Sequence, residues 1–468
     1  MNEKKDKNMK KAPHAENKEN RKDNRTAVTT GETRRVFLKR GVLVGVGAGV
    51  AGAAGTRFVG GCSPSKKEEP EKIECPPCET KVAARPSGDP KVEKGEKGEV
   101  RARAFKKWPI AKPAEVHYAR IKDGQPDKVW AQKIDELFKK LKPESLIKKD
   151  HLVALKQHFG EKGNKGHIKP ELTKKVIDEI KRLGGKPMLV ETNTLYKGSR
   201  TNTYDHIVTA RNHGFSLEAI GAPVSILDGL TGQIQQAVAI PGKHFKVVFV
   251  ASDVLFFKSL VALNHVKGHK LSGFGGALKN LAMGLASRAG KLAQHADFKP
   301  FIDSKKCIDC GDCAVWCPPG SLFMKKGKLQ FNESTCIGCG QCLTVCPHDA
   351  IHNKSPRTET NAFMEKMAEY ALGCVASFEG RTLYVNVVNH VSKACDCARG
   401  ENPVVAPDVG IFAGSDPVAV DMASLEVSRK VWGEDHFKKL YPEVDGEVTI
   451  KHAEKIGLGT TKYNLVEA

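Results

Sequence analysis

Aromatic side chains are scarce in this sequence and make up only 6% of its 468 residues. Proteins that bind single-stranded nucleic acid space aromatic residues along a basic face, so that bases can stack on them. No such spacing is present here, although the formal net charge is +21. Residues 1–61 hold 14 Lys or Arg against 6 Asp or Glu, and later in the chain acidic and basic residues are interleaved. The composition therefore argues against a nucleic-acid-binding protein.

Long hydrophobic runs are also missing. The uncharged apolar stretch at residues 41–55 is rich in Gly and Ala, and it is too short and too weakly apolar to span the ~30 Å core of a bilayer. The Gly-Phe-Gly-Gly sequence at residues 273–276 lacks the preceding strand and the downstream acid that a dinucleotide-binding turn requires. We therefore expect neither a membrane-spanning helix nor a dinucleotide site of that kind.

The N-terminal segment has the features of an export signal. Residues 1–32 are mostly Lys, Asn, Glu and Asp, a composition that cannot bury enough apolar surface to fold. Arg34 and Arg35 then precede the apolar stretch, which resembles a twin-arginine signal. Val-Gly-Gly-Cys at residues 59–62 resembles a lipobox, in which cleavage leaves Cys62 as a lipid-bearing N-terminus; the alternative is an ordinary linker thiol. We expect export to the periplasm or to the outer face of the cytoplasmic membrane.

Residues 62–107 are rich in Lys, Glu, Pro and Gly, and such a composition predicts an extended, flexible tether. Together with a lipid on Cys62, this tether would hold a soluble domain at the membrane. Cys75 and Cys78 lie inside it without flanking helix or strand signals. A reactive Cys-x-x-Cys pair needs a helix N-terminus to lower its thiol pKa, so a linker disulfide or free thiols are favoured.

Cysteine is concentrated in one region. Eight of the 14 cysteines fall in two runs of the same spacing, 29 residues apart, which favours metal ligation over disulfides. Each run has three cysteines at two-residue gaps, then a fourth cysteine followed by Pro, as in bacterial ferredoxins, where the fourth cysteine ligates the other cluster. Residues 303–354 are therefore predicted to hold two [4Fe–4S] clusters. Cluster one would take Cys307, Cys310, Cys313 and Cys346, and cluster two Cys336, Cys339, Cys342 and Cys317.

Zinc is the main alternative metal, but structural zinc sites use paired Cys-x-x-Cys units and not a run of three with a Cys-Pro. All eight ligands are thiolates, which leaves no iron open to substrate, so electron transfer is favoured over substrate chemistry. A purely structural role for the clusters stays open. Clusters are built where thiols stay reduced, so an exported cluster protein should be loaded first and exported folded, as the twin-arginine route allows.

Around this unit, short apolar runs alternate with helical patterns. We expect strands at residues 116–121, 151–155, 188–190, 224–227, 247–251 and 383–388, and helices at residues 128–141, 172–183, 361–375 and 418–431. This alternation predicts an α/β fold with a mainly parallel sheet, built from residues 108–302 and 355–468 and interrupted by a two-cluster, ferredoxin-like α+β unit.

Several polar motifs accompany this pattern. They are Lys-Gln-His-Phe-Gly at 156–160, Glu-Thr-Asn-Thr-Leu-Tyr-Lys-Gly-Ser-Arg at 191–200, Asp-Gly at 228–229, Asn-His-Val-Lys-Gly-His at 264–269, the stretch 273–284, Cys-Asp-Cys at 395–397 and Asp-Pro-Val-Ala-Val-Asp at 416–421. With these motifs the chain resembles the domain-of-unknown-function family 362 (DUF362), uncharacterised iron–sulfur centre proteins, over about residues 116–428. The resemblance implies an α/β domain with an embedded two-cluster ferredoxin and no established reaction.

The polar residues of these motifs fall at the ends of expected strands, where open α/β sheets place ligand sites. We expect one pocket lined by Lys156, His158, Asn193, Arg200, Asp228, His265, Lys267 and His269. Lys267, His269 and Lys279 beside a Gly-rich helix start would suit a small anionic substrate. The candidate catalytic residues are Lys156, His158, His265, Lys267 and His269, and the candidate ligand-binding residues are Asn193, Arg200, Asp228 and Lys279. For any single His the alternative is a structural, hydrogen-bonded role.

Cys395 and Cys397, with Cys374 upstream and His390 nearby, form a further candidate metal site. Two thiolates one residue apart can chelate zinc or another iron centre, with His390 or an Asp completing the site. The alternatives are a disulfide between Cys374 and one of the pair, or free thiols.

The sequence thus favours an exported iron–sulfur protein that passes electrons to or from a site in its α/β domain, or to a redox partner protein, as one component of an oxidoreductase. The alternative is a non-enzymatic binding, assembly or redox-sensing protein whose clusters are structural or sensory. A subunit of a larger membrane redox complex is a third hypothesis.

Overall fold

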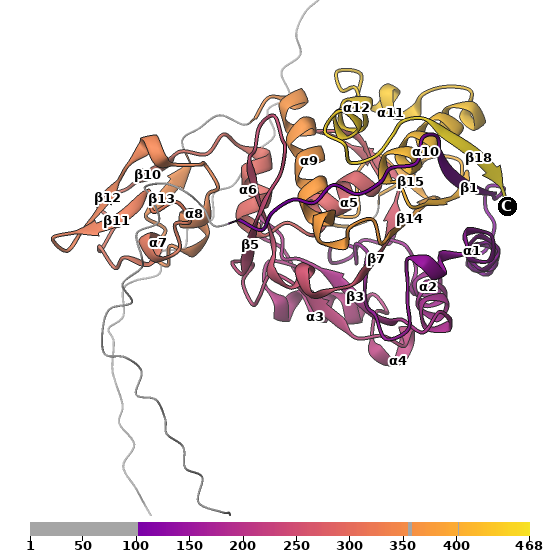
Figure 1. Cartoon of the computed structure of the whole chain (residues 1–468), viewed down its shortest axis with the longest axis horizontal. Helices are drawn as coiled ribbons and strands as arrows, with labels where there is room; N and C mark the ends of the chain where they lie inside the picture. The colour runs from indigo at the N-terminus through magenta and orange to yellow at the C-terminus, as the bar shows by residue number, and fades with distance from the viewer. Residues whose placement is uncertain (1–101, 354–357, 401) are drawn as a thin grey trace, which may run out of the picture. The chain divides into compact units, whose positions relative to one another are not determined.

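An eight-stranded sheet organises the α/β part of the chain (Figure 1). The computed structural model describes residues 102–353, 358–400 and 402–468. The strand order is β18-β1-β17-β14-β7-β2-β3-β4, and only β17 runs antiparallel to its neighbours. The predicted α/β fold with a mainly parallel sheet is therefore confirmed. The strands are β1 (Ala114–Arg120), β2 (Leu152–Lys156), β3 (Lys186–Glu191), β4 (Val224–Ile226), β7 (Ser259–His265), β14 (Thr382–Val388), β17 (Gly410–Gly414) and β18 (Tyr463–Glu467).

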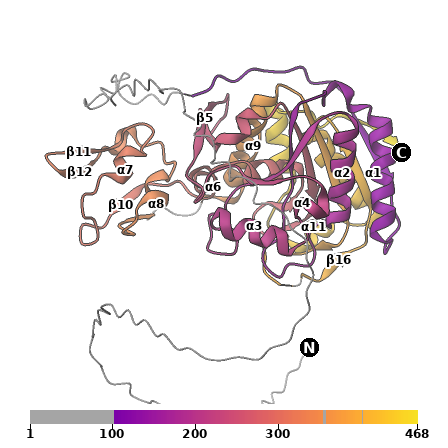
Figure 2. The ribbon, with the colours of Figure 1, turned by 90° about the horizontal axis from the view of Figure 1, so that it is seen from below.

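Helices cover both faces of this sheet, as the two ribbon views show (Figures 1 and 2). One face carries α1 (Asp127–Leu141), α2 (Pro170–Arg182), α3 (Thr203–Asn212) and α4 (Leu217–Ile220). The other carries α5 (Ala277–Gly284), α9 (Thr360–Val375), α10 (Pro417–Trp432) and α12 (Glu447–Lys455). The short helix α11 (His436–Leu440) follows α10.

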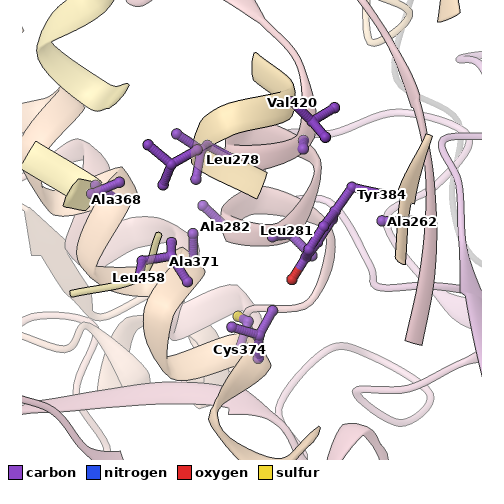
Figure 3. Close-up of a cluster of buried hydrophobic side chains, with 14 of the residues drawn as sticks. Ala262, Leu278, Leu281, Ala282, Ala368, Ala371, Cys374, Tyr384, Val420 and Leu458 are labelled. Carbon is purple, nitrogen blue, oxygen red and sulfur yellow. The ribbon is translucent and has the colours of Figure 1, made fainter. Parts of the chain in front are cut away.

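Two hydrophobic cores lie on the two faces of the sheet, because successive side chains of a strand point to opposite sides. In β7, Leu260 and Ala262 belong to the core beneath α5, α9 and α10. Val261 and Leu263 of the same strand belong to the core beneath α1 and α2. Figure 3 shows the first core, where Tyr384 of β14 lies among side chains of α5 and α9.

Among the described residues, the α/β part of the chain has three antiparallel strand pairs outside the eight-stranded sheet. They are β5 (Gln235–Ala239) with β6 (Val247–Ala251), β8 (Lys267–His269) with β9 (Gly273–Gly275), and β15 (Val391–Ser392) with β16 (Val404–Ala406). Residues 247–251 thus form the expected strand, but it pairs in a hairpin and not in the central sheet. The central strand β7 was not among the sequence predictions.

The cysteine-rich insert is closed by β10 (Pro300–Ile302), which pairs antiparallel with β13 (Ile351–Asn353). Between these strands lie α7 (Asp312–Val315), the hairpin of β11 (Leu322–Lys325) and β12 (Lys328–Phe331), and α8 (Gln341–Val345). The helix α6 (Arg288–His295) precedes the insert, and its Leu292 packs in one small hydrophobic cluster with Cys313 and Cys342.

Several sequence predictions fall outside the described residues. They concern the tail, the twin-arginine segment with Arg34 and Arg35, Cys62, and the tether with Cys75 and Cys78 up to residue 101. Within the described part of the chain, no helix combines the length and the apolarity needed to cross a membrane.

Candidate functional site

A cavity of about 340 Å³ lies at the carboxyl ends of β2, β3 and β7. These strands are parallel neighbours, so the residues at their ends meet at one edge of the sheet. The start of α5, the helix α6 and the loop with the Cys395–Cys397 disulfide complete the wall. The position is the one expected for a ligand site in an open, mainly parallel sheet.

Most of the predicted pocket residues come together here. His158, Arg200, His265, Lys267, His269 and Lys279 all line the cavity. Lys156 is completely buried beneath them, and its Nζ lies 2.9 Å from Oε1 of Glu191, which does line the cavity. Burial lowers the pKa of the Lys156 ammonium, although the Glu191 carboxylate acts in the opposite direction. Lys156 thus supports the cavity floor from below.

Asn193 and Asp228 do not line this cavity, because they bond to each other. The backbone N–H of Asn193 donates to Oδ1 of Asp228 at 3.0 Å, and its Nδ2 donates to the same oxygen at 2.9 Å. Both residues are fully buried, and burial raises the pKa of Asp228 to about 6. The pair ties the loop after β3 to the loop after β4.

A chain of buried amides runs from the cavity floor across the sheet. Lys156 Nζ donates to Asn280 Oδ1 at 2.7 Å, and Asn280 Nδ2 donates to Asn264 Oδ1 at 2.7 Å. Asn264 then donates to Asn386 at 2.9 Å, and Asn386 donates to Asp421 at 2.7 Å. Asp421 also accepts the first two backbone N–H groups of α5. This chain fixes the start of α5 against the strand ends and explains why so many polar residues are buried below the cavity.

The cavity wall is rich in cations, and they differ in their partners. Arg200 Nε lies 3.3 Å from Glu161, and Lys267 Nζ lies 2.6 Å from Asp396. Lys291 Nζ donates to the Thr192 hydroxyl at 2.6 Å. Neither Lys291 nor Lys279 has a carboxylate at ion-pair distance among the described residues, and Lys279 has no hydrogen bond there either. Lys291 Nζ also donates to the carbonyl of Ala286 at 2.7 Å, so its partners are neutral. Neither ammonium group is neutralised by a carboxylate at ion-pair distance among the described residues, and both can attract an anion.

Burial lowers the pKa of Lys279 and of Lys291 to about 8. Each ammonium is still mostly charged at neutral pH, and each loses its charge at a lower pH than an exposed lysine would. Their attraction for an anion should therefore weaken in mildly alkaline solution.

The histidines of the cavity differ in their hydrogen bonds. Nδ1 of His158 accepts the backbone N–H of Gly160 at 2.9 Å, which leaves the ring proton on Nε2. Nδ1 of His269 lies 2.8 Å from the Ser272 hydroxyl. Burial lowers the pKa of His158 and of His269 well below the usual range, so both rings are neutral at pH 7. They can exchange hydrogen bonds or protons with a bound anion but add no fixed charge.

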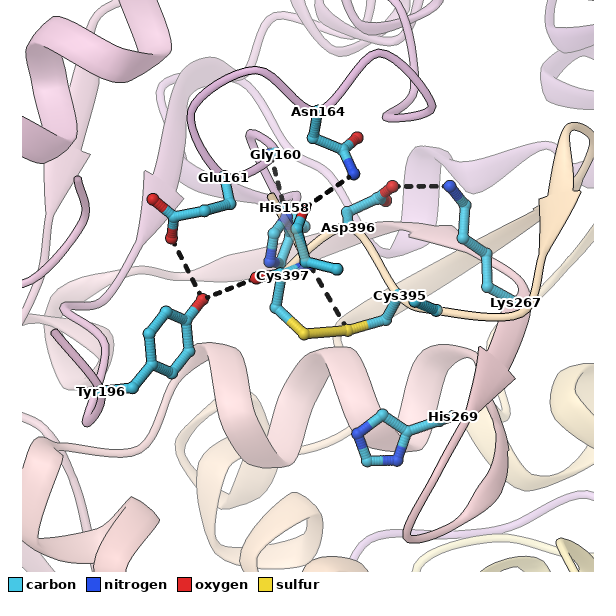
Figure 4. The surroundings of a disulfide bond; sticks show 12 residues. His158, Gly160, Glu161, Asn164, Tyr196, Lys267, His269, Cys395, Asp396 and Cys397 are labelled. Carbon is cyan, nitrogen blue, oxygen red and sulfur yellow. Dashed lines mark hydrogen bonds and ion pairs between the residues drawn. A yellow bond between two sulfur atoms is a disulfide. The ribbon is translucent and has the colours of Figure 1, made fainter. Parts of the chain in front are cut away.

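The candidate third metal site is not assembled in the structure. Cys395 and Cys397 form a disulfide with each other (Figure 4), and Cys374 is fully buried in the core of Figure 3. His390 is exposed at the turn before β15. In the described residues no three His, Cys, Asp or Glu side chains converge on a point where a single ion would bind. The four residues were grouped because they lie near one another in the sequence. In the structure, Cys374 points into the apolar core from α9.

Sequence reasoning missed other members of the wall. Glu191, Tyr196 and Asn280 lie inside motifs that were singled out, without being assigned to the pocket. Lys291 and His295 come from α6 and gave no signal in the sequence, because a helix was not expected there. The four-residue spacing of Lys291 and His295, which places both on one face of a helix, is the signal that could have found them.

The eight cysteines of the insert line two separate small cavities. Cys307, Cys310, Cys313 and Cys346 line one of them. Cys317, Cys336, Cys339 and Cys342 line the other. Each cavity thus takes three cysteines from one run and the fourth from the other run.

The two runs also share their backbone conformation. Asp309 and Gly338, which are 29 residues apart, have φ of 57° and 68°. Gly311 and Gly340, the residues before α7 and α8, have φ of 82° and 72°. These left-handed residues turn the chain around each cavity, and alternating right- and left-handed residues aim backbone N–H groups at an enclosed anion. An iron–sulfur cluster with its thiolates is such an anion.

A family model described as a domain of unknown function, DUF362, matches residues 153–426, a span that includes every residue of the large cavity and all eight insert cysteines. The chain belongs to the DUF362 family.

Two kinds of relative accompany this DUF362 match. Pyruvate synthase subunit PorD of Methanothermobacter marburgensis is 43% identical over 37 residues, which are 8% of this chain and 46% of that protein. The chain thus spans about half the length of this curated relative. Among solved structures, the lactate racemase apoprotein from Thermoanaerobacterium thermosaccharolyticum has 11% identity and a TM-score of 0.34, covering 68% of this chain and 57% of that one. A Thermotoga maritima protein has 10% identity and a TM-score of 0.34, covering 72% and 60%. At these scores the two structures carry no argument about function.

Proposed function

We propose that this DUF362 protein is an exported electron-transfer protein that holds two [4Fe–4S] clusters and serves the cavity of its α/β domain or a redox partner protein. One observation carries the proposal: the insert gathers its eight cysteines into two sets of four, each around its own cavity. The sets are those of a two-cluster ferredoxin, with the fourth cysteine exchanged between the runs. The short match to PorD is compatible with an iron–sulfur protein.

The donor set fits a cluster better than it fits a single ion. Four cysteines around a cavity are the ligand set of a [4Fe–4S] centre, and backbone N–H groups bond to the sulfur atoms of Cys317 and Cys346. Burial raises the pKa of Cys313 to about 11 and of Cys339 to about 12. Without metal these thiols would stay protonated at neutral pH, so cluster binding would have to release their protons.

The insert is attached to the α/β domain and does not stand alone. Gln233 Nε2 donates to the carbonyl of Thr344 at 3.0 Å, and Gln341 Nε2 donates back to the carbonyl of Gln233 at 3.4 Å. Leu292 of α6 packs in the same cluster as Cys342. A cluster held here would be a fixed relay beside the α/β domain and not a free shuttle.

The cavity is the natural destination or source of these electrons. It offers the cations Lys279 and Lys291, neither of which pairs with a carboxylate among the described residues, and the neutral imidazole of His158. Such a wall suits a small anionic substrate that exchanges protons as it exchanges electrons.

Export is the remaining part of the proposal and is supported by the sequence of residues 1–62. Replacing Arg34 and Arg35 together by Lys should keep the full chain in the cytoplasm in a cell fractionation experiment. Cys62→Ala should release exported protein from the membrane fraction. If the double Lys variant were exported normally, the twin-arginine assignment would be wrong.

Paired cysteine variants test the exchanged ligation directly. Cys307→Ser with Cys346→Ser should remove one cluster and leave about four irons, since both residues line the same cavity. Cys307→Ser with Cys342→Ser should damage both clusters, because these residues line different cavities. Cys374→Ala is the control, since this thiol lies in the core, and it should keep the iron content of the wild type.

The alternative, a binding, assembly or sensing protein, makes a different prediction for the cavity. If Lys267→Ala with His269→Ala changed neither cluster reduction by a physiological donor nor the binding of any ligand, the cavity would have no part in electron transfer. The clusters would then be structural or sensory.

A further inference from the structure

We propose that the Cys395–Cys397 disulfide is redox-active and takes up two electrons from the two clusters, an inference that rests on the proposed function. The disulfide is part of the cavity wall, together with Asp396 between its cysteines. Both cysteines are half-buried, so their sulfur atoms can be reached from the cavity. Figure 4 shows the disulfide between the side of the wall with Tyr196 and the side with His269.

A stabilising role does not explain this disulfide. Cross-links stabilise mainly by restricting the unfolded chain, and the effect grows with the length of the closed loop. Here only Asp396 lies between the two cysteines, so the unfolded chain is hardly restricted. The position in the cavity wall is the feature that needs an explanation.

The loop is held in place by contacts that do not involve the S–S bond. Asp396 accepts from Lys267 Nζ at 2.6 Å, and its other oxygen lies 3.0 Å from Nδ1 of His265. The backbone N–H of Glu161 donates to the carbonyl of Asp396 at 2.8 Å. When the S–S bond opens, these contacts keep both sulfur atoms at the cavity, ready to close again.

The surroundings favour the reduced form of Cys395. The backbone N–H of Cys397 points at Cys395 Sγ, with the nitrogen 3.4 Å from the sulfur. Lys279, which makes no hydrogen bond or ion pair among the described residues, lines the same cavity. A hydrogen-bond donor and nearby cations stabilise a thiolate relative to a thiol. Cys395 is therefore the cysteine that would carry negative charge after reduction.

One helix connects the cysteine insert to this cavity. Lys291 and His295 of α6 line the cavity, while Leu292 of the same helix packs with Cys313 and Cys342. Leu195 contacts both regions, since it lines the cavity and packs against the hydrophobic side chains around Cys313 and Cys342. Helix α6 and Leu195 thus contact both the cavity and the hydrophobic cluster of the insert.

The electrons balance in this scheme. Each reduced [4Fe–4S]⁺ cluster returns to [4Fe–4S]²⁺ by giving up one electron, so two clusters supply two. The S–S bond between Cys395 and Cys397 breaks, two protons are taken up from solvent, and two thiols form; if Cys395 stays a thiolate, only one proton is taken up. The clusters are oxidised and the disulfide is reduced. The insert and the cysteine pair together convert two one-electron steps into one two-electron step.

An anaerobic reductive titration of the holoprotein with dithionite tests this inference. All chains in this test carry Cys75→Ser and Cys78→Ser, so that a linker disulfide adds no electrons. With the wild-type cavity, the chain should then take up about four electrons, one for each cluster and two for the disulfide. Cys395→Ser with Cys397→Ser should take up about two, and the core control Cys374→Ala should again take up about four. If the chain with the wild-type cavity carries two reducible clusters but takes up only about two electrons, the inference is overturned.

Alkylation of the wild type gives a second reading that needs no disulfide variant. Iodoacetamide followed by peptide mass spectrometry should label Cys395 and Cys397 only after the clusters have been reduced. Cys342→Ser, which lacks a ligand of one cluster, should show slower labelling under the same dithionite concentration; equally fast labelling would mean direct chemical reduction and would overturn the relay. If anaerobically purified protein contained no iron, the proposed function itself would be overturned. This result differs from the failure of the disulfide to be reduced, so the two outcomes can be told apart.

Discussion

Lys267 Nζ lies 2.6 Å from Oδ1 of Asp396, the residue that separates the two cysteines of the disulfide. Both side chains are buried, and His265 contacts the other oxygen of the same carboxylate. Burial alone would raise the pKa of Asp396, but the charges of His265 and Lys267 hold it well below its usual range. This ion pair anchors the cysteine loop to the start of β8.

Asp396→Asn should therefore destabilise the fold. Removing one charge of a buried pair leaves the other uncompensated, which costs about 3–5 kcal/mol. The control is Asp178→Asn, which breaks the exposed pair with Lys174 and should change the free energy of unfolding by less than about 1 kcal/mol. Urea unfolding of both holoprotein variants measures the difference, and equal effects would contradict a buried anchor.

Lys279→Met should weaken the binding of an anion to the cavity. With sulfate as the probe, whose charge is constant between pH 7 and 9, the wild type should bind at least roughly tenfold more weakly at pH 9, because Lys279 and Lys291, each with a pKa of about 8, lose their charge in this interval. Lys279→Met should bind weakly at pH 7 and change less with pH. Calorimetry makes the comparison.

The matched control for that experiment is Lys197→Met, since Lys197 is exposed on the loop after β3 and does not line the cavity. It should bind sulfate as the wild type does at both pH values. An equal loss of binding in Lys197→Met would mean that the general surface charge, and not the cavity, attracts the anion.

Gly340→Ala should disturb the second of the two proposed cluster sites, the cavity lined by Cys317, Cys336, Cys339 and Cys342. Gly340 has φ of 72°, and a Cβ atom there would lie 2.1 Å from Cδ2 of Leu292 on α6. Gly327 has φ of 71°, but a Cβ atom there would meet nothing within 4 Å. Gly327→Ala should thus cost only the backbone strain of about 1–2 kcal/mol, and Gly340→Ala about 1–3 kcal/mol more from overpacking. Thermal unfolding and iron content of the two variants check this, and identical results would contradict the close contact with α6.

Much of the fold could be predicted because its elements carry local signals. The helices α1, α2, α9 and α10 have apolar residues at helical spacing, and β1 to β4 and β14 are short apolar runs. The central strand β7 is not predicted from the sequence, because its last residues, Asn264 and His265, are polar and belong to a motif that indicates a site. The run at residues 247–251 looks like a sheet strand, but only tertiary pairing places it in a hairpin with β5.

The candidate site could be predicted in part for a similar reason. The ends of neighbouring parallel strands meet at one edge of the sheet, so the sequence places His158, His265 and Lys267 at one site. All three line the cavity. It does not tell where a side chain points, so Asn193 and Asp228 were assigned to the pocket although they bond to each other. Nothing in the sequence shows that α6 turns Lys291 toward the cavity.

The measurement that tests the central claim most directly is metal and sulfide analysis of anaerobically purified holoprotein, combined with EPR after reduction. Two [4Fe–4S] clusters require about eight irons and about eight sulfides per chain, and two magnetically interacting signals when both clusters are reduced. Zinc in place of iron, or iron without acid-labile sulfide, would contradict the account.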